Sequence, residues 1–306
     1  MREVVSDKQS WEFPEGHEIA PGRTTLRALG GGNRYEVYLV WDERHFSVMV
    51  AKVLRPDLVE EEYALRGLRR ELEALDALAH PVLLRAFDAH IDGPYPHVVV
   101  EHLEGPTLKR LIKRDGRLPL EQTLPLGLHV ASVLHYMAEE GWVHLDLKPA
   151  NLVMAIPPRV IDLSLARTTE RAKRLTDYIG TNAYMPPEQC NPRADVGPPA
   201  DVWGLGATLY HAVAGKLPFR RPRSRADDAP REDRFPQLED EPRPWPVPVP
   251  AALSDAVLAC LEKDPAARPT AAELASMLQP LVAELPSRLV FGRRGSSGSA
   301  RSRELA

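Results

Sequence analysis

The stretch HLDLKPAN, residues 144–151, indicates the fold of this 306-residue sequence more strongly than any other stretch. Asp146 stands two positions before Lys148 and five before Asn151. A carboxylate can accept the proton of a hydroxyl nucleophile, an ammonium can neutralise a phosphoryl group in transfer, and an amide oxygen can bind magnesium. A chance loop with this spacing is not rare, so the pattern needs support from a second motif.

That second motif is VIDL, residues 160–163, which places Asp162 eleven positions after Asn151 in an apolar frame. A carboxylate at the end of a short apolar strand is well placed to bind a metal ion. The two motifs together predict a site in which Asp146 orients and deprotonates a hydroxyl while Asn151 and Asp162 hold the metal. The alternative is that both aspartates have purely structural roles, and the spacing between the two motifs disfavours this alternative.

Two features nearer the N-terminus are weaker. The glycines at residues 30–32 would let backbone N–H groups approach phosphates, although such a cluster is more often a plain hairpin turn. Lys52 lies among apolar strand residues, where an unpaired ammonium is costly to bury. It either faces outward or pairs with phosphates and with a carboxylate of the next helix. Glu71 is the best candidate for that carboxylate, and Glu73 could instead belong to a solvated face.

The residues before position 105 read mainly as strands. Runs that mix β-branched and aromatic residues, separated by turn residues, predict strands over residues 26–29, 35–41, 47–54 and 97–100. One helix is predicted among them, over residues 60–79, where leucine recurs every three or four positions until His80-Pro81 stops the pattern.

The residues beyond Gly105 read mainly as helices, predicted over residues 108–113, 120–141, 200–214, 251–262 and 271–285. A small strand-rich part therefore precedes a larger helical part, which predicts a two-lobed α+β enzyme with a cleft at the join. We expect residues 1–22 to be a loose leader and residues 286–306 a disordered tail. Residues 220–250 are rich in proline and charge, so we expect an extended or mobile loop there.

The composition excludes several classes of protein. A content of 43% hydrophobic and 27% charged residues is ordinary for a soluble globular chain, and a net charge of −4 does not favour nucleic acid as a partner. Cys190 and Cys260 are too few for a disulfide framework or a cysteine zinc cluster. The sequence contains no run of about 18 apolar residues, so no transmembrane helix is predicted, and no signal peptide is recognisable. The expected compartment is the cytoplasm.

Taken together, the motifs resemble those of the protein kinase family in order and spacing, specifically the bacterial eukaryotic-like (Hanks-type) serine/threonine branch. The resemblance covers about residues 23–285 and includes three further elements: GTNAYMPPEQ at residues 180–189, DVWGLG at residues 201–206 and KDPAARPT at residues 263–270. It implies a two-lobed protein kinase-like fold with a small antiparallel β-rich N-lobe that carries one key helix, over about residues 23–100. A hinge at residues 101–105 and a larger mainly α-helical C-lobe at residues 106–285 would follow, with the nucleotide cleft between the lobes.

The resemblance also implies an activity, namely transfer of the γ-phosphoryl group of ATP to serine or threonine hydroxyls of proteins, the chain itself included. The implied cofactors are ATP and Mg²⁺, with Mn²⁺ as an alternative metal. Lys148 and Thr181 resemble residues of serine/threonine rather than tyrosine kinases. The catalytic residues that it implies are Asp146, Lys148, Lys52, Glu71 and Thr181. The nucleotide-binding residues that it implies are Leu29, Gly30, Gly31, Gly32, Val37, Ala51, Lys52, Val100, Glu101, Leu103, Asn151, Leu152 and Asp162, with Asn151 and Asp162 as metal ligands.

Two structural roles are implied as well. Glu188 and Arg268 would form a buried ion pair, and Asp201 would brace the backbone of the catalytic loop. The expected partners are protein substrates and soluble regulators, and we hypothesise that residues 220–250 help to dock them. A passive solvated loop is the alternative for that segment, and the sequence favours it.

Three positions depart from the family pattern. Tyr35 replaces the third glycine of the phosphate loop and should stiffen the loop tip, and Ser164 replaces the glycine after Asp162-Leu163. Leu145 stands where most members carry an arginine that pairs with a phosphorylated residue, so we expect phosphorylation at Thr168, Thr169 or Thr176 not to be the main on-switch. These departures leave two alternatives open: a pseudokinase that binds nucleotide or partners without catalysis, and, more weakly, a small-molecule kinase.

Overall fold

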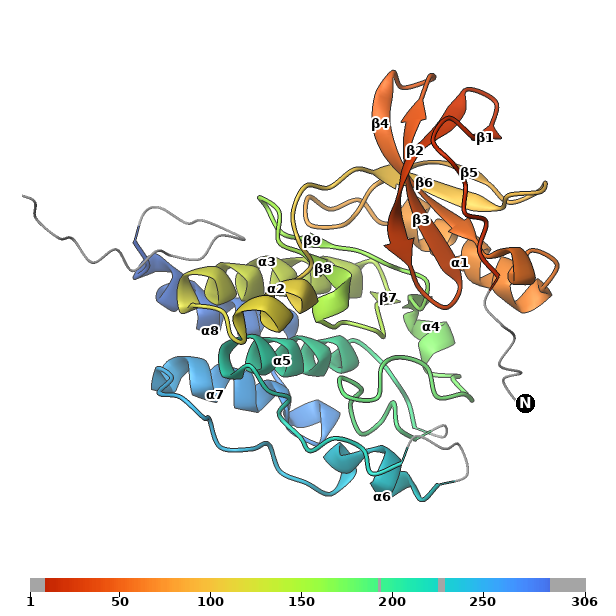
Figure 1. Cartoon of the computed structure of the whole chain (residues 1–306). Helices are drawn as coiled ribbons and strands as arrows, with labels where there is room; N and C mark the ends of the chain where they lie inside the picture. Colours follow the sequence, from red (N-terminus) through yellow and green to blue (C-terminus); the bar gives the residue numbers. More distant parts are fainter. Residues whose placement is uncertain (1–8, 192–193, 225–228, 287–306) are drawn as a thin grey trace, which may run out of the picture.

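An antiparallel sheet of six strands forms the N-terminal lobe in the computed structural model, which describes residues 9–191, 194–224 and 229–286. The strands pair in the order β1-β2-β3-β4-β6-β5 (Figure 1). The short turn η1 (Pro56–Leu58) leads from the sheet into helix α1 (Glu62–Ala77), which packs against β5 and β6. The strands are β1 (Glu18–Ala20), β2 (Arg23–Gly31), β3 (Tyr35–Asp42), β4 (Ser47–Leu54), β5 (Ala86–His90) and β6 (His97–Glu101).

Helices build the larger C-terminal lobe. Helix α3 lies at its centre and packs against α5 and α8, and α5 packs in turn against α7. The main helices are α2 (Leu108–Asp115), α3 (Leu120–Glu139), α5 (Pro199–Ala214), α7 (Ala251–Cys260) and α8 (Ala271–Ala283). Two short antiparallel pairs, β7 with β10 and β8 with β9, lie where this lobe meets the sheet (Figure 1). Their bounds are β7 (Trp142–Val143), β8 (Leu152–Val153), β9 (Arg159–Val160) and β10 (Arg167–Thr168).

The remaining elements are single turns of helix: η2 (Pro149–Asn151), α4 (Thr169–Ala172), α6 (Arg231–Arg234), η3 (Pro236–Leu238) and η4 (Pro265–Ala267). The predicted two-lobed α+β fold is confirmed. Each of the predicted long helices is present, with ends that differ by a few residues from those expected. None of the helices within the described ranges has the length and apolar character needed to span a membrane.

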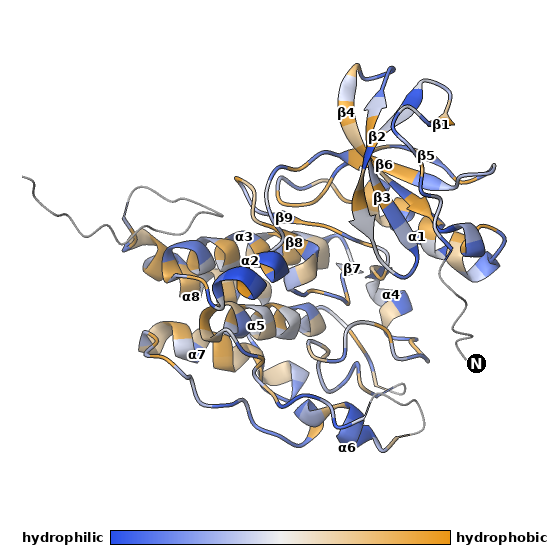
Figure 2. Cartoon of the chain, in the orientation of Figure 1, coloured by the Kyte–Doolittle hydropathy of each residue, from blue (hydrophilic) through white to orange (hydrophobic). Residues whose placement is uncertain are grey.

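Local sequence explains where helices begin and end. Apolar spacing places Leu68 and Leu75 on the buried face of α1, so the helix follows the predicted leucine pattern. Helix α8 starts with a capping box in which Thr270 and Glu273 satisfy each other's backbone N–H groups. Helix α5 ends at Gly215, whose φ of 67° lies in the left-handed region that glycine adopts at helix ends. Apolar residues line the interior of the helical lobe (Figure 2).

The predicted loose leader is wrong for residues 9–22. The indole Nε1 of Trp11 donates to the carbonyl of Leu54 at 2.7 Å. The Trp11 and Phe13 rings pack against Tyr95, with centroids 4.9 and 5.0 Å away. The segment then pairs with the sheet through β1. Because aromatic rings bury much apolar area each, they fix even a polar, proline-containing segment to the sheet. Residues 1–8 lie outside the described residues.

The described part of residues 220–250 is also folded, in contrast to the predicted extended loop. It contains α6 and η3, and the Phe235 side chain between them is fully buried. Further along, the Trp245 ring stacks on Tyr210 with centroids 4.4 Å apart, and the Tyr210 hydroxyl donates to the Arg243 carbonyl at 2.9 Å. These aromatic anchors outweigh the proline-rich composition. Residues 225–228, and the predicted tail at residues 287–306, lie outside the described residues.

Candidate active site

The loop that carries Asp146 is held by hydrogen bonds to its backbone. The Asp201 carboxylate, in the first turn of α5, accepts the N–H groups of His144 at 2.6 Å and Leu145 at 2.8 Å. The carbonyl of Leu145 accepts the amide of Gln189 at 2.8 Å. These bonds hold Leu145 at a φ of 67°, a conformation that costs free energy for a residue other than glycine. The bracing role expected of Asp201 matches this geometry.

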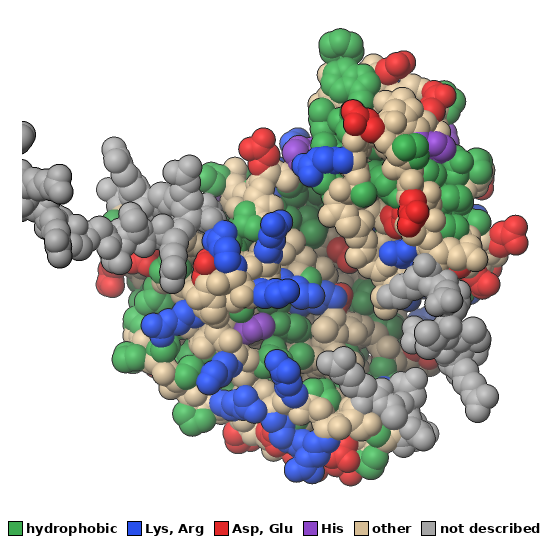
Figure 3. Space-filling view, in the orientation of Figure 1, with side chains coloured by type: hydrophobic (Ala, Val, Ile, Leu, Met, Phe, Trp, Pro, Cys, Tyr) green, Lys and Arg blue, Asp and Glu red, His purple; other side chains and the backbone are tan. Residues whose placement is uncertain are grey.

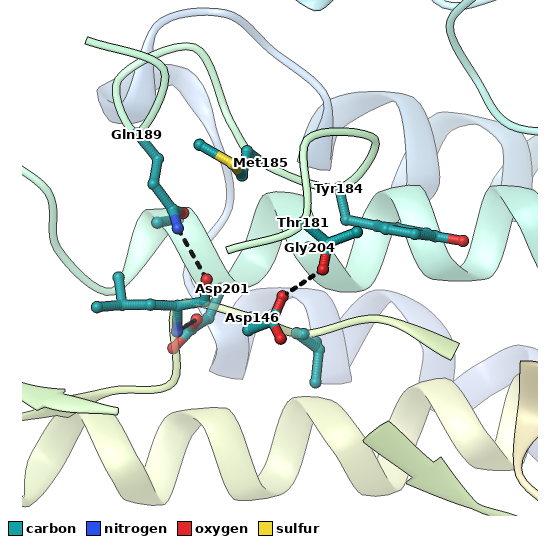
Figure 4. Close-up of a pocket in the computed structure, with 10 residues that line it drawn as sticks. Asp146, Thr181, Tyr184, Met185, Gln189, Asp201 and Gly204 are labelled. Carbon is teal, nitrogen blue, oxygen red and sulfur yellow. Dashed lines mark hydrogen bonds between the residues drawn. The ribbon is translucent and has the colours of Figure 1, made fainter. Parts of the chain in front are cut away.

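Both carboxylate oxygens of Asp146 accept hydrogen bonds from neighbouring side chains. The Thr181 hydroxyl donates to Oδ1 at 2.8 Å, and the Lys148 ammonium donates to Oδ2 at 2.5 Å. Lys148 also donates to the Thr181 hydroxyl at 2.7 Å, which closes a triangle of contacts. Figure 4 shows the hydrogen bond between Thr181 and Asp146 beside a small pocket that both residues line, together with Gln189 and Asp201. Thr181 lies in the segment that leads from Asp162 to Gln189, here called the activation segment, and these bonds join that segment to the catalytic loop.

The two expected metal ligands are neighbours. The Asn151 amide donates through Nδ2 to the Asp146 carbonyl at 3.0 Å, which leaves Oδ1 as the atom suited to a cation. The backbone carbonyl of Asn151 accepts the N–H of Ile161 at 2.9 Å, so the β8–β9 pair brings Asp162 beside the catalytic loop. Oxygen atoms from an amide and a carboxylate form a donor set that suits Mg²⁺.

An ammonium from the sheet joins these carboxylates. Lys52 on β4 donates to the Glu71 carboxylate of α1 and, at 3.2 Å, to Asp162 Oδ1. Burial alone would lower the pKa of Lys52, but Asp162 and Glu71 outweigh it and raise that pKa, so the lysine stays protonated. Desolvation by itself would raise the pKa of Asp162. The Lys52 ammonium and the Ser164 hydroxyl outweigh this effect and hold the pKa of Asp162 below its usual value.

The structure distinguishes between the two candidate partners of Lys52. Glu71 is fully buried on the face of α1 that meets the sheet. Glu73, two residues on, lies at the surface and pairs with Arg171 at 2.7 Å. Residues two apart on a helix point in different directions, which explains the separation. The preference for Glu71 is therefore supported, and Glu73 belongs to an exposed ion pair.

The glycine-rich turn between β2 and β3 is open to a ligand. Gly30 has a φ of 131°, which favours glycine, and an added Cβ at Gly30 or Gly32 would meet no atom within 4 Å. At Gly31 a Cβ would lie 2.7 Å from the Tyr35 carbonyl, so a side chain would force this turn apart. The neighbouring Leu29 is exposed. These features are compatible with a turn whose backbone covers phosphates.

The apolar residues expected around a nucleotide divide between the two faces of the sheet. Val37 and Val100 pack on the same apolar cluster as Leu103 and Leu152, which is the face of β4 that carries Lys52. Ala51 instead belongs to the opposite face, fully buried with Tyr38 and Val99.

The prediction that Ala51 contacts the nucleotide is therefore wrong, because successive side chains of a strand point to opposite faces. Val50, two positions before Lys52, lies on the face of Lys52 and is the residue that the sequence reasoning missed. Because alternate residues of a strand share a face, counting back two positions from Lys52 identifies Val50. Glu101 ends β6 and is held by ion pairs with Arg159 at 3.2 Å and Arg85 at 3.6 Å.

The departure at Tyr35 has a different consequence from the one expected. Tyr35 is the first residue of β3 rather than the tip of the glycine turn. Its ring is 9% exposed and lies under the Lys52 ammonium, which is 5.0 Å from the ring centroid. Burial raises the pKa of its hydroxyl. Tyr35 thus packs inside the lobe beside Lys52 instead of stiffening the loop tip.

Two more residues of the active-site region were missed. Gln189 donates to the carbonyls of Leu145 and Ile179, and so ties the catalytic loop to the activation segment. Gln237 in η3, only 2% exposed, donates to the carbonyls of Asn182 at 2.8 Å and Met185 at 2.9 Å. Nothing in the local sequence around Gln237 indicates these contacts.

The Glu188–Arg268 ion pair forms as expected. The guanidinium and the carboxylate make two parallel hydrogen bonds of 2.7 and 2.8 Å. This bidentate geometry is the strong arrangement for arginine and a carboxylate. It fixes the end of the activation segment to the loop before α8.

Comparisons with known proteins agree with this geometry. The family model described as the protein kinase domain matches residues 23–278. The chain belongs to the protein kinase family. It is 33% identical over 259 residues to serine/threonine-protein kinase PknB of Mycobacterium leprae, covering 80% of this chain and 40% of that protein. It is 32% identical over 240 residues to serine/threonine-protein kinase PkaA of Streptomyces coelicolor, covering 76% and 42%.

The predicted resemblance to bacterial serine/threonine protein kinases is therefore confirmed. The chain spans about two fifths of the length of these curated relatives. Members of the protein kinase family use ATP and a divalent metal ion to phosphorylate their substrates.

Proposed function

We propose that this chain is an active serine/threonine protein kinase that transfers the γ-phosphoryl group of ATP to protein hydroxyls. One observation carries the proposal: Lys52 from the sheet contacts both Glu71 of α1 and Asp162 of the helical lobe. This contact links the sheet, helix α1 and the helical lobe, which an active protein kinase must align. We propose that the domain spans residues 23–285, with residues 9–22 packed on it.

Each polar residue of the site has a chemical task in this proposal. Asp146 accepts the proton of the attacking serine or threonine hydroxyl and orients its oxygen. Lys148, beside Asp146, neutralises charge that builds on the transferring group. Thr181 holds both side chains in place. Because Lys148 and Thr181 occupy this position together, the site resembles that of kinases with serine or threonine acceptors.

The donor set supports a magnesium nucleotide as phosphoryl donor. Asn151 Oδ1 and the Asp162 carboxylate would hold Mg²⁺, with Mn²⁺ as an alternative, and the metal would neutralise the phosphates when bound. Lys52 would add a positive charge to the same phosphates. The open glycine turn at residues 30–32 would supply backbone N–H groups. Val37, Val50, Val100 and Leu103 would contact the base.

The proposal is tested by incubating the purified chain with labelled ATP, Mg²⁺ and a generic serine/threonine peptide. We expect autophosphorylation and peptide phosphorylation that stop when a chelator removes the metal. Asp146→Asn should lower kcat by about 10²–10⁴-fold, the usual contribution of a general base, and leave nucleotide binding intact. Nucleotide binding without any phosphoryl transfer by the wild-type chain would instead identify a pseudokinase and refute the proposal.

A further inference from the structure

Helix α2 carries an exposed basic face in the helical lobe. Figure 3 shows Lys and Arg side chains gathered over α2 and over the segment that follows α5, and Figure 2 shows that α2 is largely hydrophilic. We call this surface the α2 basic face. Its exposed members are Lys109, Arg110, Lys113, Arg114, Arg117 and Lys216.

Helix geometry and loop packing explain why these charges meet. Leu108, Leu111 and Ile112 are buried, so the 3.6-residue period turns the intervening basic residues of α2 to solvent. The loop after α5 then lies against the end of α2. A Cβ added at Gly215 would lie 2.4 Å from the Gly116 carbonyl and 3.6 Å from the Arg117 side chain. This contact brings the residue that follows Gly215 to the edge of the face.

Most of the charges of this face are not neutralised by salt bridges within the described residues. In the described ranges, Arg114 makes a salt bridge with Asp115 at 2.8 Å, and no salt bridge is formed by Lys109, Arg110, Lys113, Arg117 or Lys216. Like charges four residues apart on a helix destabilise it. The basic residues concentrate here although the whole chain has a formal net charge of −4. The helix dipole stabilises Lys113 and Arg114 in the last turn of α2, but it does not account for the basic residues at the start of the helix and beyond it, which favours a role in recognition.

The helix that carries this face adjoins the catalytic loop. Helix α2 packs against η2, the turn that ends in Asn151, and against β8. The strand-like bridge between Thr107 and Val153, and the 2.9 Å hydrogen bond from the Met154 N–H to the Pro106 carbonyl, fix the start of α2 to that loop. A substrate role for this face requires that residues flanking a hydroxyl placed at Asp146 reach it.

We propose that the α2 basic face binds acidic side chains of the protein substrate, so that hydroxyls flanked by Asp or Glu are the favoured acceptors. The inference rests on the proposed kinase activity and adds a substrate class to it. Its position beside the catalytic loop favours a peptide over a nucleic acid or an anionic membrane, although all three carry the complementary charge.

The test compares two peptides with one acceptor serine, one with Glu at the flanking positions and one with Gln at the same positions. For the wild-type chain we expect kcat/KM to be about tenfold higher for the Glu peptide, since several exposed charge contacts each contribute modestly. This advantage should shrink as salt rises from about 0.15 M to 1 M, because the Debye length falls from about 8 Å to about 3 Å.

The variant is Lys109→Glu/Lys113→Glu/Arg117→Glu, and Arg44→Glu, in the exposed β3–β4 turn, is its matched control. The three replaced side chains are exposed and form no salt bridge within the described ranges, so the melting temperature of the triple variant should change little. It should abolish or reverse the preference for the Glu peptide and keep the rate with the Gln peptide, whereas Arg44→Glu should behave like the wild type.

Equal kcat/KM for both peptides in the wild type, or an unchanged preference in the triple variant, would overturn the inference while the kinase activity stands. Absence of transfer to either peptide and of autophosphorylation would refute the proposed function itself. Phosphatidylserine vesicles and single-stranded DNA are tested for binding in parallel. If either binds through the face and the wild type shows no peptide preference, the substrate role is wrong.

Discussion

The buried ion pair between Arg268 and Glu188 has several further partners in the helical lobe. Arg268 is 6% exposed and Glu188 8%. Besides the two bonds to the carboxylate, the guanidinium donates to the carbonyls of Glu262 at 2.7 Å, Pro199 at 3.0 Å and Lys263 at 3.2 Å. Its charge also lies 5.0 Å from the centroid of the Trp203 ring. Arg268→Ala removes all of these contacts and leaves a buried carboxylate without its partner.

The expected cost follows from these contacts. Removing one member of a buried ion pair typically costs about 3–5 kcal/mol, because the other charge stays desolvated. The carbonyls can recover part of their hydrogen bonding from water, so their loss does not add in full. We therefore expect Arg268→Ala to lower the free energy of unfolding by about 4 kcal/mol, a large share of the usual 5–15 kcal/mol.

The assay is urea unfolding followed by circular dichroism, with nucleotide absent. Arg66→Ala, which breaks an exposed pair with Glu62 at 3.5 Å, is the control and should cost under about 0.5 kcal/mol. The double variant Glu188→Ala/Arg268→Ala should be less destabilised than the sum of its single variants, because neither charge is left alone. A loss below about 1 kcal/mol for Arg268→Ala would refute the reasoning.

Three further outcomes are expected. Lys52→Met should lower kcat at least about 100-fold with an unchanged circular dichroism spectrum, because a preorganised positive charge at the phosphates is lost; wild-type turnover would contradict its assigned role. Thr169→Ala and Thr176→Ala should each keep most of the kinase activity, since Leu145 cannot pair with a phosphate, and near-complete loss in a labelled-ATP assay would show this wrong. Gln237→Leu leaves two buried carbonyls without donors, so kcat/KM for a peptide should fall about tenfold while KM for ATP stays constant; equal losses in both would indicate general misfolding instead.

The catalytic loop was predictable because its chemistry is local in sequence. The spacing of Asp146, Lys148 and Asn151 states which groups are available, and the apolar frame of Asp162 indicates a strand end. The helices were predictable for a similar reason, since leucine periodicity records which face is buried. The ion pair at Arg268 came from resemblance to a family and not from any local pattern.

Other features depended on packing between distant segments. The polar composition of residues 9–22 outweighed the aromatic rings of Trp11 and Phe13 in the sequence reasoning, although those rings dock on the sheet. Ala51 was misassigned because its strand's two faces are both apolar, so neither face could be recognised as the ligand side. Gln237 could not be found at all, because its carbonyl partners are more than 50 residues away.

The sequence by itself thus determined the inventory of reactive groups, their order along the chain and the alternation between strands and helices. Only the tertiary structure decided that Lys52 pairs with Glu71 instead of Glu73, that Thr181 closes on Asp146, and that basic residues from two segments share one surface. The physical reason is that propensity and periodicity act over a few residues, whereas these contacts depend on how whole elements pack to bury apolar area.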